Sequence, residues 1–505
     1  MFGDIKKELG DYQTPLDFAE VITEFVKKHI SFYPSKIVEP TCGVGNFLLA
    51  SYKKFNESEI IGIDINKNYL SEAKEKIDNL GAVNYKLINE NIFYYNYEDI
   101  INDDKVLIIG NPPWVTNSYL TNGKIKNLPN KSNFKNHNGF EAMTGSSNFD
   151  ICEYIILDAL GKIKSKRVCL AMLCKTNVAI NVIKELRRQN NLIQNGIILK
   201  FNTKEIFNVS ADACLLFIEK NTNICSGVDK FKVYNFENNK IEIQSQMGFV
   251  NGDFVINCDS YVSELDGSSP FEWRQGVKHD SSKIMELTLD KTNRFINGYG
   301  EVLNIEDTLV YPLIKSSDIK RWKDNEIIRK HVIITQHKVG EDTGYIKKDS
   351  PKLWDYLNLH AEKLTSRKSS IYKNAPKFSI FGIGEYSFSK YKVAISGFYK
   401  DPLFVMLKSE KSIMLDDTCY FLSFDDEKTA KIATIVLNSD IVREFLLSIT
   451  NVNSKRPYTK KILSRIDLKA ACNLLDFKYL QKSENDIFHS NDINEKDYKN
   501  FIKSL

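Results

Sequence analysis

The segment Lys36–Phe47, KIVEPTCGVGNF, joins a short apolar run to a helix-forming stretch through a turn that contains two glycines. Its first four residues predict a buried strand, and the residues after the turn, to about position 55, predict a helix. Glycine lets the backbone approach a ligand closely in such a turn, although the Gly43-Val44-Gly45 spacing differs from the dinucleotide-binding fingerprint. The segment therefore predicts a strand–turn–helix unit of an α/β fold.

The same alternation continues on both sides of this segment. Further strands are predicted at residues 59–65, 85–88, 105–109, 167–173, 196–201 and 213–219, and helices at 16–30, 68–79, 151–164 and 178–189. This order predicts an α/β, Rossmann-like domain whose mostly parallel sheet has helices on both faces and binds ligands at the carboxyl ends of its strands. Because the alternation stops near residue 245, we expect a first domain over residues 1–240 and a mixed α+β domain over 241–505.

Composition sets the broad class of the protein. The 505 residues are 42% hydrophobic and 27% charged, as in globular proteins, and the net charge of +4 permits a polyanionic partner without demonstrating one. The nine cysteines form no Cys-x-x-Cys pair and there are only seven histidines, so we expect no metal site. No apolar run approaches the ~20 residues that span a bilayer, and the N-terminus lacks a signal-peptide pattern, so we expect a cytoplasmic protein without membrane contact.

The motif Asn111-Pro112-Pro113-Trp114 follows an apolar strand and carries the most specific chemistry. Two prolines hold the backbone extended and leave its carbonyls free. The Asn111 side-chain oxygen and a proline carbonyl can then accept both hydrogens of one amino group, beside the aromatic face of Trp114. Such acceptors draw the lone pair of an aromatic amine toward an electrophile, which stabilises the transition state more than the ground state. A plain strand-ending turn with a core tryptophan is the alternative.

Three other strand ends provide candidate cofactor contacts. The turn after the first strand contains Glu39 and the two glycines, and Asp64 ends the second strand, where an acidic side chain commonly binds ribose hydroxyls. Asn91 lies in the loop after the third strand, where a polar side chain can meet an adenine edge. A tight structural turn and a helix-capping aspartate are the alternatives for the first two.

Taken in order, these motifs resemble the gamma-class, TaqI-like adenine-N6 DNA methyltransferases of restriction–modification systems. Gln13-Thr14-Pro15, Glu39–Phe47, Asp64 and Asn111–Trp114 resemble that family's motifs for S-adenosylmethionine (SAM) binding and catalysis, and Ser147–Asp150 resembles the following motif. The resemblance covers roughly residues 10–220. Trp114 stands where Tyr or Phe is commoner in the family, and Asn91 where Asp is usual.

The resemblance implies a mechanism and a set of site residues. A flipped-out adenine would stack on Trp114 and on Phe207 of the segment Glu205-Ile206-Phe207, while Asn111 and the Pro112 carbonyl hold its amino group. Pro113 completes the catalytic motif. The implied SAM contacts are Thr14, Glu39, Thr41, Cys42, Gly43, Gly45, Asp64, Ile65, Asn91, Ile92, Asn111 and Phe149. No metal is implied.

The region after residue 240 is expected to recognise target DNA. Basic residues alternate with aromatic ones at Lys320–Lys323, Tyr391-Lys392, Tyr399-Lys400 and Lys455–Lys461, a composition that suits phosphate contacts. We select Lys320, Arg321, Lys455 and Arg456 as DNA-binding candidates, although each cluster alone is typical of a solvated surface. The expected partners are double-stranded DNA, bound as a monomer, and a separate cognate restriction endonuclease.

Several other functions stay open at this point. An RNA-base or protein-glutamine methyltransferase with the same motif would leave the long C-terminal region without a role. A bifunctional nuclease lacks a convincing Pro-Asp…Asp/Glu-x-Lys pattern, and a non-catalytic DNA-binding subunit would not need Asn111–Trp114. Cytosine-N4 methylation uses similar acceptors, although Ser-Pro-Pro is more usual there.

Overall fold

The computed structural model describes residues 12–101, 105–115, 150–325 and 327–505. The chain divides into two compact units, residues 1–259 and 260–505. The division falls later than the boundary expected near residue 240, because β8 (Lys230–Glu237), β9 (Lys240–Val250) and β10 (Asp253–Val255) extend the sheet of the first unit. No described helix has the length and apolar composition needed to cross a membrane.

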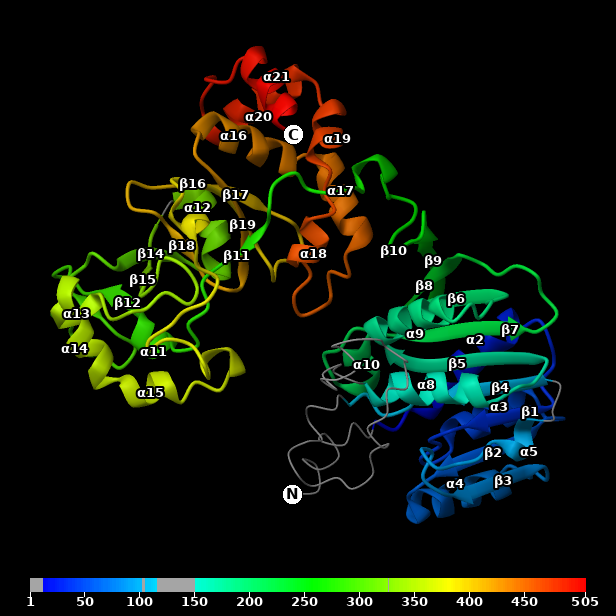
Figure 1. The fold of residues 1–505 in the computed structure, drawn as a ribbon. Helices are drawn as coiled ribbons and strands as arrows, with labels where there is room; N and C mark the ends of the chain where they lie inside the picture. Colours follow the sequence, from blue (N-terminus) through cyan, green and yellow to red (C-terminus); the bar gives the residue numbers. More distant parts are fainter. Residues whose placement is uncertain (1–11, 102–104, 116–149, 326) are drawn as a thin grey trace. The chain divides into compact units, whose positions relative to one another are not determined.

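The first unit contains, within the described residues, a ten-stranded sheet in the order β10-β9-β8-β6-β7-β5-β4-β1-β2-β3 (Figure 1). From β3 to β5 all neighbours are parallel, whereas β7 runs antiparallel to both β5 and β6. The predicted α/β fold with a mostly parallel sheet is confirmed. Its other strands are β1 (Lys36–Glu39), β2 (Glu59–Asp64), β3 (Tyr85–Asn89), β4 (Lys105–Gly110), β5 (Arg167–Lys175), β6 (Asn195–Phe201) and β7 (Ala213–Asn221).

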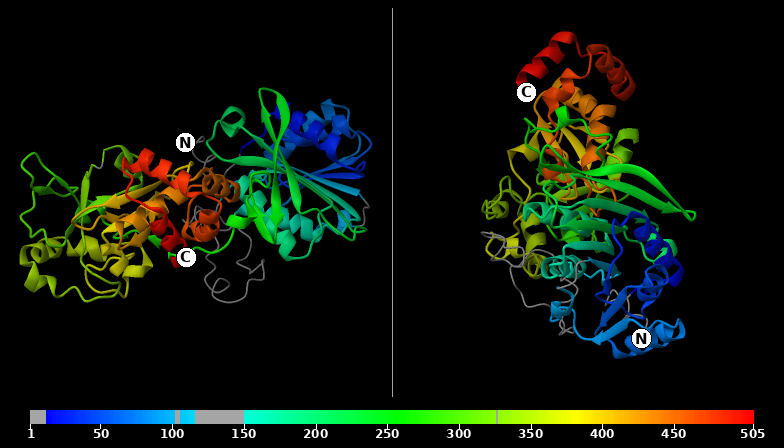
Figure 2. Two further views of the ribbon diagram at one scale, coloured as in Figure 1. Left: turned by 90° about the horizontal axis from the view of Figure 1, so that it is seen from above. Right: turned by 90° about the vertical axis from the view of Figure 1, so that its right-hand side faces the viewer.

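Helices cover both faces of this sheet. One face is covered by α2, which packs on α3, and by α4, and the other by α8, which packs on α9 (Figure 2). The described helices of the unit are α2 (Leu16–His29), α3 (Asn46–Lys54), α4 (Lys67–Asn79), α5 (Glu98–Ile101), α8 (Ile151–Lys162), α9 (Thr176–Arg188) and α10 (Thr203–Phe207).

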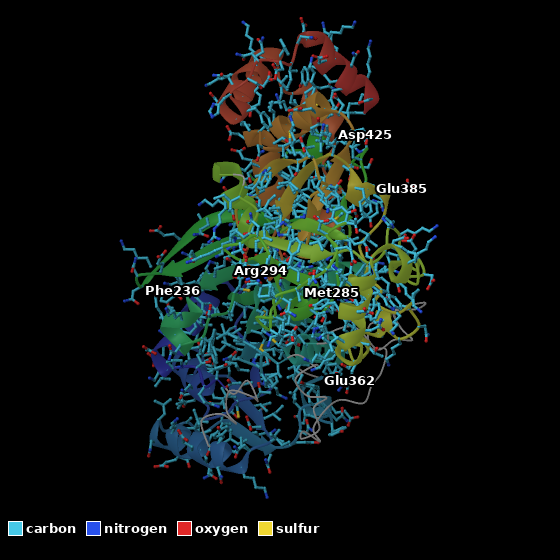
Figure 3. All side chains as sticks on the ribbon, turned by 90° about the vertical axis from the view of Figure 1, so that its left-hand side faces the viewer. Phe236, Met285, Arg294, Glu362, Glu385 and Asp425 are labelled. Atoms are coloured by element: carbon cyan, nitrogen blue, oxygen red, sulfur yellow. The ribbon has the colours of Figure 1, made fainter. Side chains whose placement is uncertain are left out.

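The sequence explains where these elements begin and which face they bury. In α2, Phe18, Ile22 and Phe25 recur at helical spacing and are all buried, and basic residues in the last turn complement the helix dipole. The helix packs over β6 and β8, where Phe18 contacts Phe236 of β8, labelled in Figure 3, with ring centroids 5.8 Å apart. Asn66 caps α4 by accepting from the Asn68 backbone N–H at 3.0 Å.

The described residues of the second unit form two sheets, of order β11-β19-β16-β17 and β13-β12-β15-β14-β18. Their strands are β11 (Arg274–Gln275), β12 (Glu286–Leu289), β13 (Phe295–Ile296), β14 (Val310–Ile314), β15 (Lys330–Ile333), β16 (Tyr391–Ser396), β17 (Phe404–Lys408), β18 (Met414–Leu415) and β19 (Cys419–Phe424). These sheets and their helices form the mixed α+β domain that was predicted.

Helices pack on both sheets and form most of the C-terminal end of the chain. Those described are α11 (Ser282–Met285), α12 (Ile319–Asn325), α13 (Ile346–Asp349), α14 (Pro351–Leu359), α15 (Ala361–Thr365), α16 (Glu427–Leu437), α17 (Asp440–Ile449), α18 (Lys460–Leu463), α19 (Leu468–Asn473), α20 (Phe477–Phe488) and α21 (Glu495–Ser504), with short 3₁₀ helices η1 (Ser263–Leu265), η2 (Ser316–Asp318), η3 (Ser370–Tyr372) and η4 (Glu385–Phe388).

Lys392 corrects one expectation from the sequence. The Tyr391-Lys392 pair lies in β16, whose residues are buried on both faces, and Lys392 is only 2% exposed. Its ammonium donates to the Ser389 carbonyl at 2.7 Å. A lysine buried in this way cannot contact a DNA phosphate, and burial lowers its pKa to about 7.

We expect Lys392→Met to stabilise the protein near neutral pH. An unfolded lysine has a pKa of ~10.4, so between about pH 7 and that value the unfolded chain binds the additional proton and wild-type stability rises with pH. Methionine removes this dependence and should raise the free energy of unfolding near pH 7 by about 1–3 kcal/mol. Urea titrations of both proteins at neutral and at alkaline pH measure this, with exposed Lys390→Met as control. A wild-type stability that is independent of pH over this window would contradict the expectation.

Candidate functional site

A cavity of about 330 Å³ lies where β1, β2, β3 and β4 end, at the carboxyl edge of the sheet. Glu39 is the last residue of β1 and Asp64 of β2, Asn91 follows β3, and Asn111 follows β4. All four line the cavity. Parallel neighbours in the sheet thus bring together side chains that are up to 72 residues apart in the sequence.

The turn after β1 depends on its two glycines. Gly43 and Gly45 have φ of +51° and +76°, which L side chains rarely adopt. A Cβ atom on Gly45 would also lie 2.9 Å from the Cβ atom of Ala73. Gln13 accepts from the Val44 backbone N–H at 3.2 Å, so the segment before α2 packs onto the turn.

Asp64 holds this turn against the end of β2. Its carboxylate accepts from the backbone N–H of Gly43 and from that of Asn66, both at 2.8 Å. The side chain predicted to bind a ribose therefore also fixes the glycine turn. Ile65, the next residue, lines the cavity and is 53% exposed.

Glu39 is a buried acid of the cavity. Burial, and then the nearby Asp64 charge, raise the pKa of Glu39 well above its usual value. Its Oε2 atom is buried without a hydrogen-bond partner among the described residues. Gly110, at φ +155°, leaves room for the glutamate, since a Cβ there would lie 3.0 Å from Glu39 Cγ.

Asn111 presents one end of its amide to the cavity. Its Nδ2 donates to the Tyr12 carbonyl at 3.0 Å, whereas its Oδ1 is buried and has no partner in the described part of the chain. Pro113 lines the cavity as well, while Pro112 is buried and is not among the lining residues. The oxygen of Asn111 is thus available to accept a hydrogen bond from a ligand.

Trp114 and Phe207 lie together, as the sequence suggested, but in edge-to-face contact. Their ring centroids are 5.5 Å apart at an interplanar angle of 74°. Trp114 is 8% exposed and its Nε1 donates to the Leu173 carbonyl at 3.3 Å. In this arrangement the two rings touch each other, so neither offers a parallel partner for a base placed between them.

Lys175, at the end of β5, was missed by the sequence analysis. Its ammonium donates to the Trp114 carbonyl at 3.0 Å and to Asp150 at 3.1 Å. Asp150 also caps α8 by accepting from the Cys152 backbone N–H at 3.1 Å, and burial raises the pKa of Asp150. The only sequence signal was a cation that ends an otherwise apolar strand.

Most of the predicted cofactor contacts line this one cavity. Gly45 belongs to the turn but not to the lining, and Phe149 lies outside the described residues. Tyr12, Asn46, Tyr69 and Phe93 line it without having been predicted. The predicted residues found there are Thr14, Glu39, Thr41, Cys42, Gly43, Asp64, Ile65, Asn91, Ile92 and Asn111.

The four DNA-binding candidates lie in the second unit. Lys320 and Arg321 are exposed residues of the first turn of α12. Lys455 is exposed and Arg456 is half-buried in the loop before α18. Across the described residues, no group of three His, Cys, Asp or Glu side chains is arranged to hold a metal ion.

Comparisons with known proteins agree with this architecture. The family model described as N-6 DNA Methylase matches residues 2–292. The chain is 38% identical over 486 residues to the Type II methyltransferase M.NspV of Nostoc sp. (strain ATCC 29411 / PCC 7524), covering 93% of this chain and 98% of that protein. It is 33% identical over 115 residues to the Type II methyltransferase M.CvrRI of Paramecium bursaria Chlorella virus XZ-6E, covering 22% of this chain and 27% of that one.

A solved structure shares the fold. The Type IIL restriction-modification enzyme MmeI, in complex with DNA, matches with a TM-score of 0.55 and 14% identity, covering 100% of this chain and 78% of that chain. At this identity the likeness concerns the fold alone.

Glu39→Gln tests the buried acid of the cavity. Because the folded pKa is raised, the carboxyl contributes stability that is fully present below its unfolded pKa of ~4.3 and is lost as pH rises toward the folded value. Between these two pKa values, the free energy of unfolding of the glutamine variant should therefore rise relative to that of the wild type by about 1.4 kcal/mol per pH unit. Ligand-free unfolding free energies from about pH 5 to 8 give the comparison. Glu90→Gln, at an exposed position lining the same cavity, is the control, and parallel profiles for wild type and Glu39→Gln would refute the expectation.

Proposed function

The chain belongs to the N-6 DNA methylase family, and we propose that it transfers the methyl group of SAM to the N6 amino group of an adenine flipped out of double-stranded DNA. The family membership makes it a DNA methyltransferase of the restriction–modification type. The resemblance recognised in the sequence is thereby confirmed at the level of the family. We propose SAM as the cofactor, adenine as the target base and base flipping as part of the mechanism.

One observation supports this proposal above the others. Three buried polar atoms of the cavity, Glu39 Oε2, Thr41 Oγ1 and Asn111 Oδ1, have no hydrogen-bond partner among the described residues. Each unpaired buried group costs about 1–3 kcal/mol, so folded proteins rarely leave several together unless a ligand pairs with them. All three atoms are acceptors, or can act as acceptors, which suits a ligand rich in N–H and O–H donors.

The hydrogen-bond acceptors of the cavity suit the donors of SAM. Its ammonium, ribose hydroxyls and adenine amino group are donors, and the cavity offers Glu39, Asp64 and Asn91 at adjacent strand ends. The glycine turn permits close approach of a ligand to the backbone. When bound, SAM supplies a methyl group activated by its sulfonium. The groups that would hold it are those of the turn after β1, the ends of β2 and β3, and Thr14.

Asn111 would orient the amino group of the target base. The hydrogen bond from Nδ2 to the Tyr12 carbonyl fixes the amide, so that its unpaired Oδ1 accepts a hydrogen from the amine. Together with the Pro112 carbonyl, this acceptor would draw the nitrogen lone pair toward the methyl group. Trp114 would stack on the base, provided that the edge-to-face contact with Phe207 opens.

We also propose that the protein acts as a monomer beside a separate cognate endonuclease.

Methylation of a purified plasmid, followed by long-read sequencing for modified bases, tests the proposal directly. Methyl-adenine at one short motif is the expected result. Methyl-cytosine would replace adenine by cytosine-N4 as the target, and unmodified DNA together with methylated RNA or protein in a substrate panel would overturn the DNA assignment.

Asn111→Ala should lower the methylation rate constant by about 10²–10³, because it removes an acceptor used in the transition state. SAM affinity measured by calorimetry should stay within about threefold of the wild type, since Asn111 is one of many cavity groups. Asn56→Ala, at an exposed position, is the matched control. Retention of the wild-type rate by Asn111→Ala would rule out this role.

Lys175→Met tests a positioning role for the lysine that holds the Trp114 carbonyl. We expect kcat to fall about tenfold with little change in SAM affinity, because the motif loses a fixed contact while the cofactor turn does not. Lys175→Arg should recover part of kcat, since arginine retains the charge near Asp150. Lys220→Met, at a half-buried lysine of β7, controls for general destabilisation. An equal loss in the Lys175→Met and Lys220→Met variants would show a structural effect only.

A further inference from the structure

In the second unit, two basic segments, near residues 320 and 455, meet a third, the turn of residues 397–403 between β16 and β17. The Lys320 backbone N–H donates to the Tyr399 hydroxyl at 3.3 Å, which places the start of α12 beside the turn. The same turn contacts the segment before α18: Lys400 Nζ donates to Asn453 at 3.1 Å, and the Tyr458 hydroxyl donates to the Lys400 carbonyl at 2.9 Å. Clusters that were scattered over the sequence therefore form one surface.

An exposed aromatic ring lies in this basic surface. Phe398 is 42% exposed, although it belongs to a residue type that is usually buried. The Arg456 guanidinium lies over its ring, 5.2 Å from the centroid. The neighbouring Gly397 contributes no side chain, and a Cβ there would lie 3.1 Å from Arg456 Cγ. The backbone of the turn thus leaves room for the arginine to reach the phenylalanine.

The charge of this surface is predominantly positive. Lys320, Arg321, Lys400 and Lys455 are exposed and have no ion pair with any described residue. The nearby acids are largely engaged: Asp401 pairs with Arg443 at 2.8 Å, Asp318 pairs with Arg329, and Asp417 lies 4.0 Å from Arg456. Cations without carboxylate partners around an exposed aromatic ring suit a ligand that combines phosphates with flat bases.

We propose that this surface, formed by Lys320, Arg321, Phe398, Lys400, Lys455 and Arg456, binds double-stranded DNA and that Phe398 inserts against the bases. The proposal rests on the proposed function for its substrate and adds the side chain that contacts the base stack. The lysines and arginines contact phosphates and orient the duplex. Phe398 acts as an apolar wedge at a base step, a role in which phenylalanine partly unstacks the duplex. The Arg456 guanidinium packs on the Phe398 ring and also contacts a phosphate.

The experiment measures binding of a fluorescein-labelled duplex, cut from the test plasmid, to the full-length protein over a series of salt concentrations. Phe398→Ala should weaken binding about tenfold at constant salt slope, because the ring carries no charge. Arg456→Gln should lower the salt slope by about one counterion. Phe398→Trp should keep the wild-type affinity. The matched control is Tyr299→Ala, which removes another exposed ring of the same unit that lies under a lysine, 4.1 Å from Lys363 Nζ.

The outcomes separate this inference from the proposed function. Wild-type affinity of the Phe398→Ala variant overturns the wedge, whether or not the wild-type protein methylates the plasmid. If Phe398→Ala lowers the salt slope as Arg456→Gln does, the ring only holds the arginine in place, and the wedge is again overturned. Failure of the wild type to methylate DNA, with the Phe398→Ala loss intact, overturns the proposed function and leaves the DNA surface standing.

Discussion

Parallel pairing of β1 with both β2 and β4 is the constraint on which the site depends. Glu39 pairs with Gly62 of β2, and Val38 with Ile108 of β4, so the three strands end at the same edge. Neighbouring strands lie about 4.8 Å apart, which is within reach of one small ligand. A one-residue slip of β4 would turn its side chains to the other face and displace Asn111 from the cavity. The strand register therefore determines which side chains reach the cavity.

The cavity is maintained at some cost to stability. Glu39 is buried beside Asp64, and burial disfavours its charged form. The turn between them requires Gly43 at positive φ, and Gly110 must lack a side chain to admit the glutamate. Well-packed apolar residues at these positions would stabilise the sheet more. Unpaired polar atoms and glycines at positive φ lie together at one sheet edge, as a ligand site requires, because the polar groups pair once the ligand binds and the glycines let it approach the backbone.

The sequence predicted the parts of the site that depend on local order. Glu39, Asp64 and Asn111 could be located because each follows an apolar run, and the carboxyl ends of parallel strands meet at one edge. Lys175 could not, because its contact with the Trp114 carbonyl spans 61 residues and no local pattern indicates it. Lys392 was misplaced since its basic–aromatic sequence resembles a surface strand, whereas both faces of β16 are covered.

Long-range packing also explains the surface of the second unit. The basic segments near positions 320, 400 and 455 have similar compositions to other lysine-rich segments, and only their meeting at the β16–β17 turn distinguishes them. Composition gives the number of charges but not their partners. Whether a charge is free to bind a phosphate depends on which carboxylates fold beside it, and that is a property of the tertiary structure.

The contact between Trp114 and Phe207 determines which ring must move under the proposed function. Trp114 is held at both ends, since its Nε1 donates to Leu173 and its carbonyl accepts from Lys175. Phe207 ends a five-residue helix, and its phenyl ring packs against the apolar core, with Phe18 at 6.2 Å among its neighbours. Moving the indole would break the Nε1 hydrogen bond to Leu173, whereas moving the phenyl ring of Phe207 breaks no side-chain hydrogen bond. Entry of a base would therefore displace Phe207, and Trp114 would serve as the fixed face on which the base stacks.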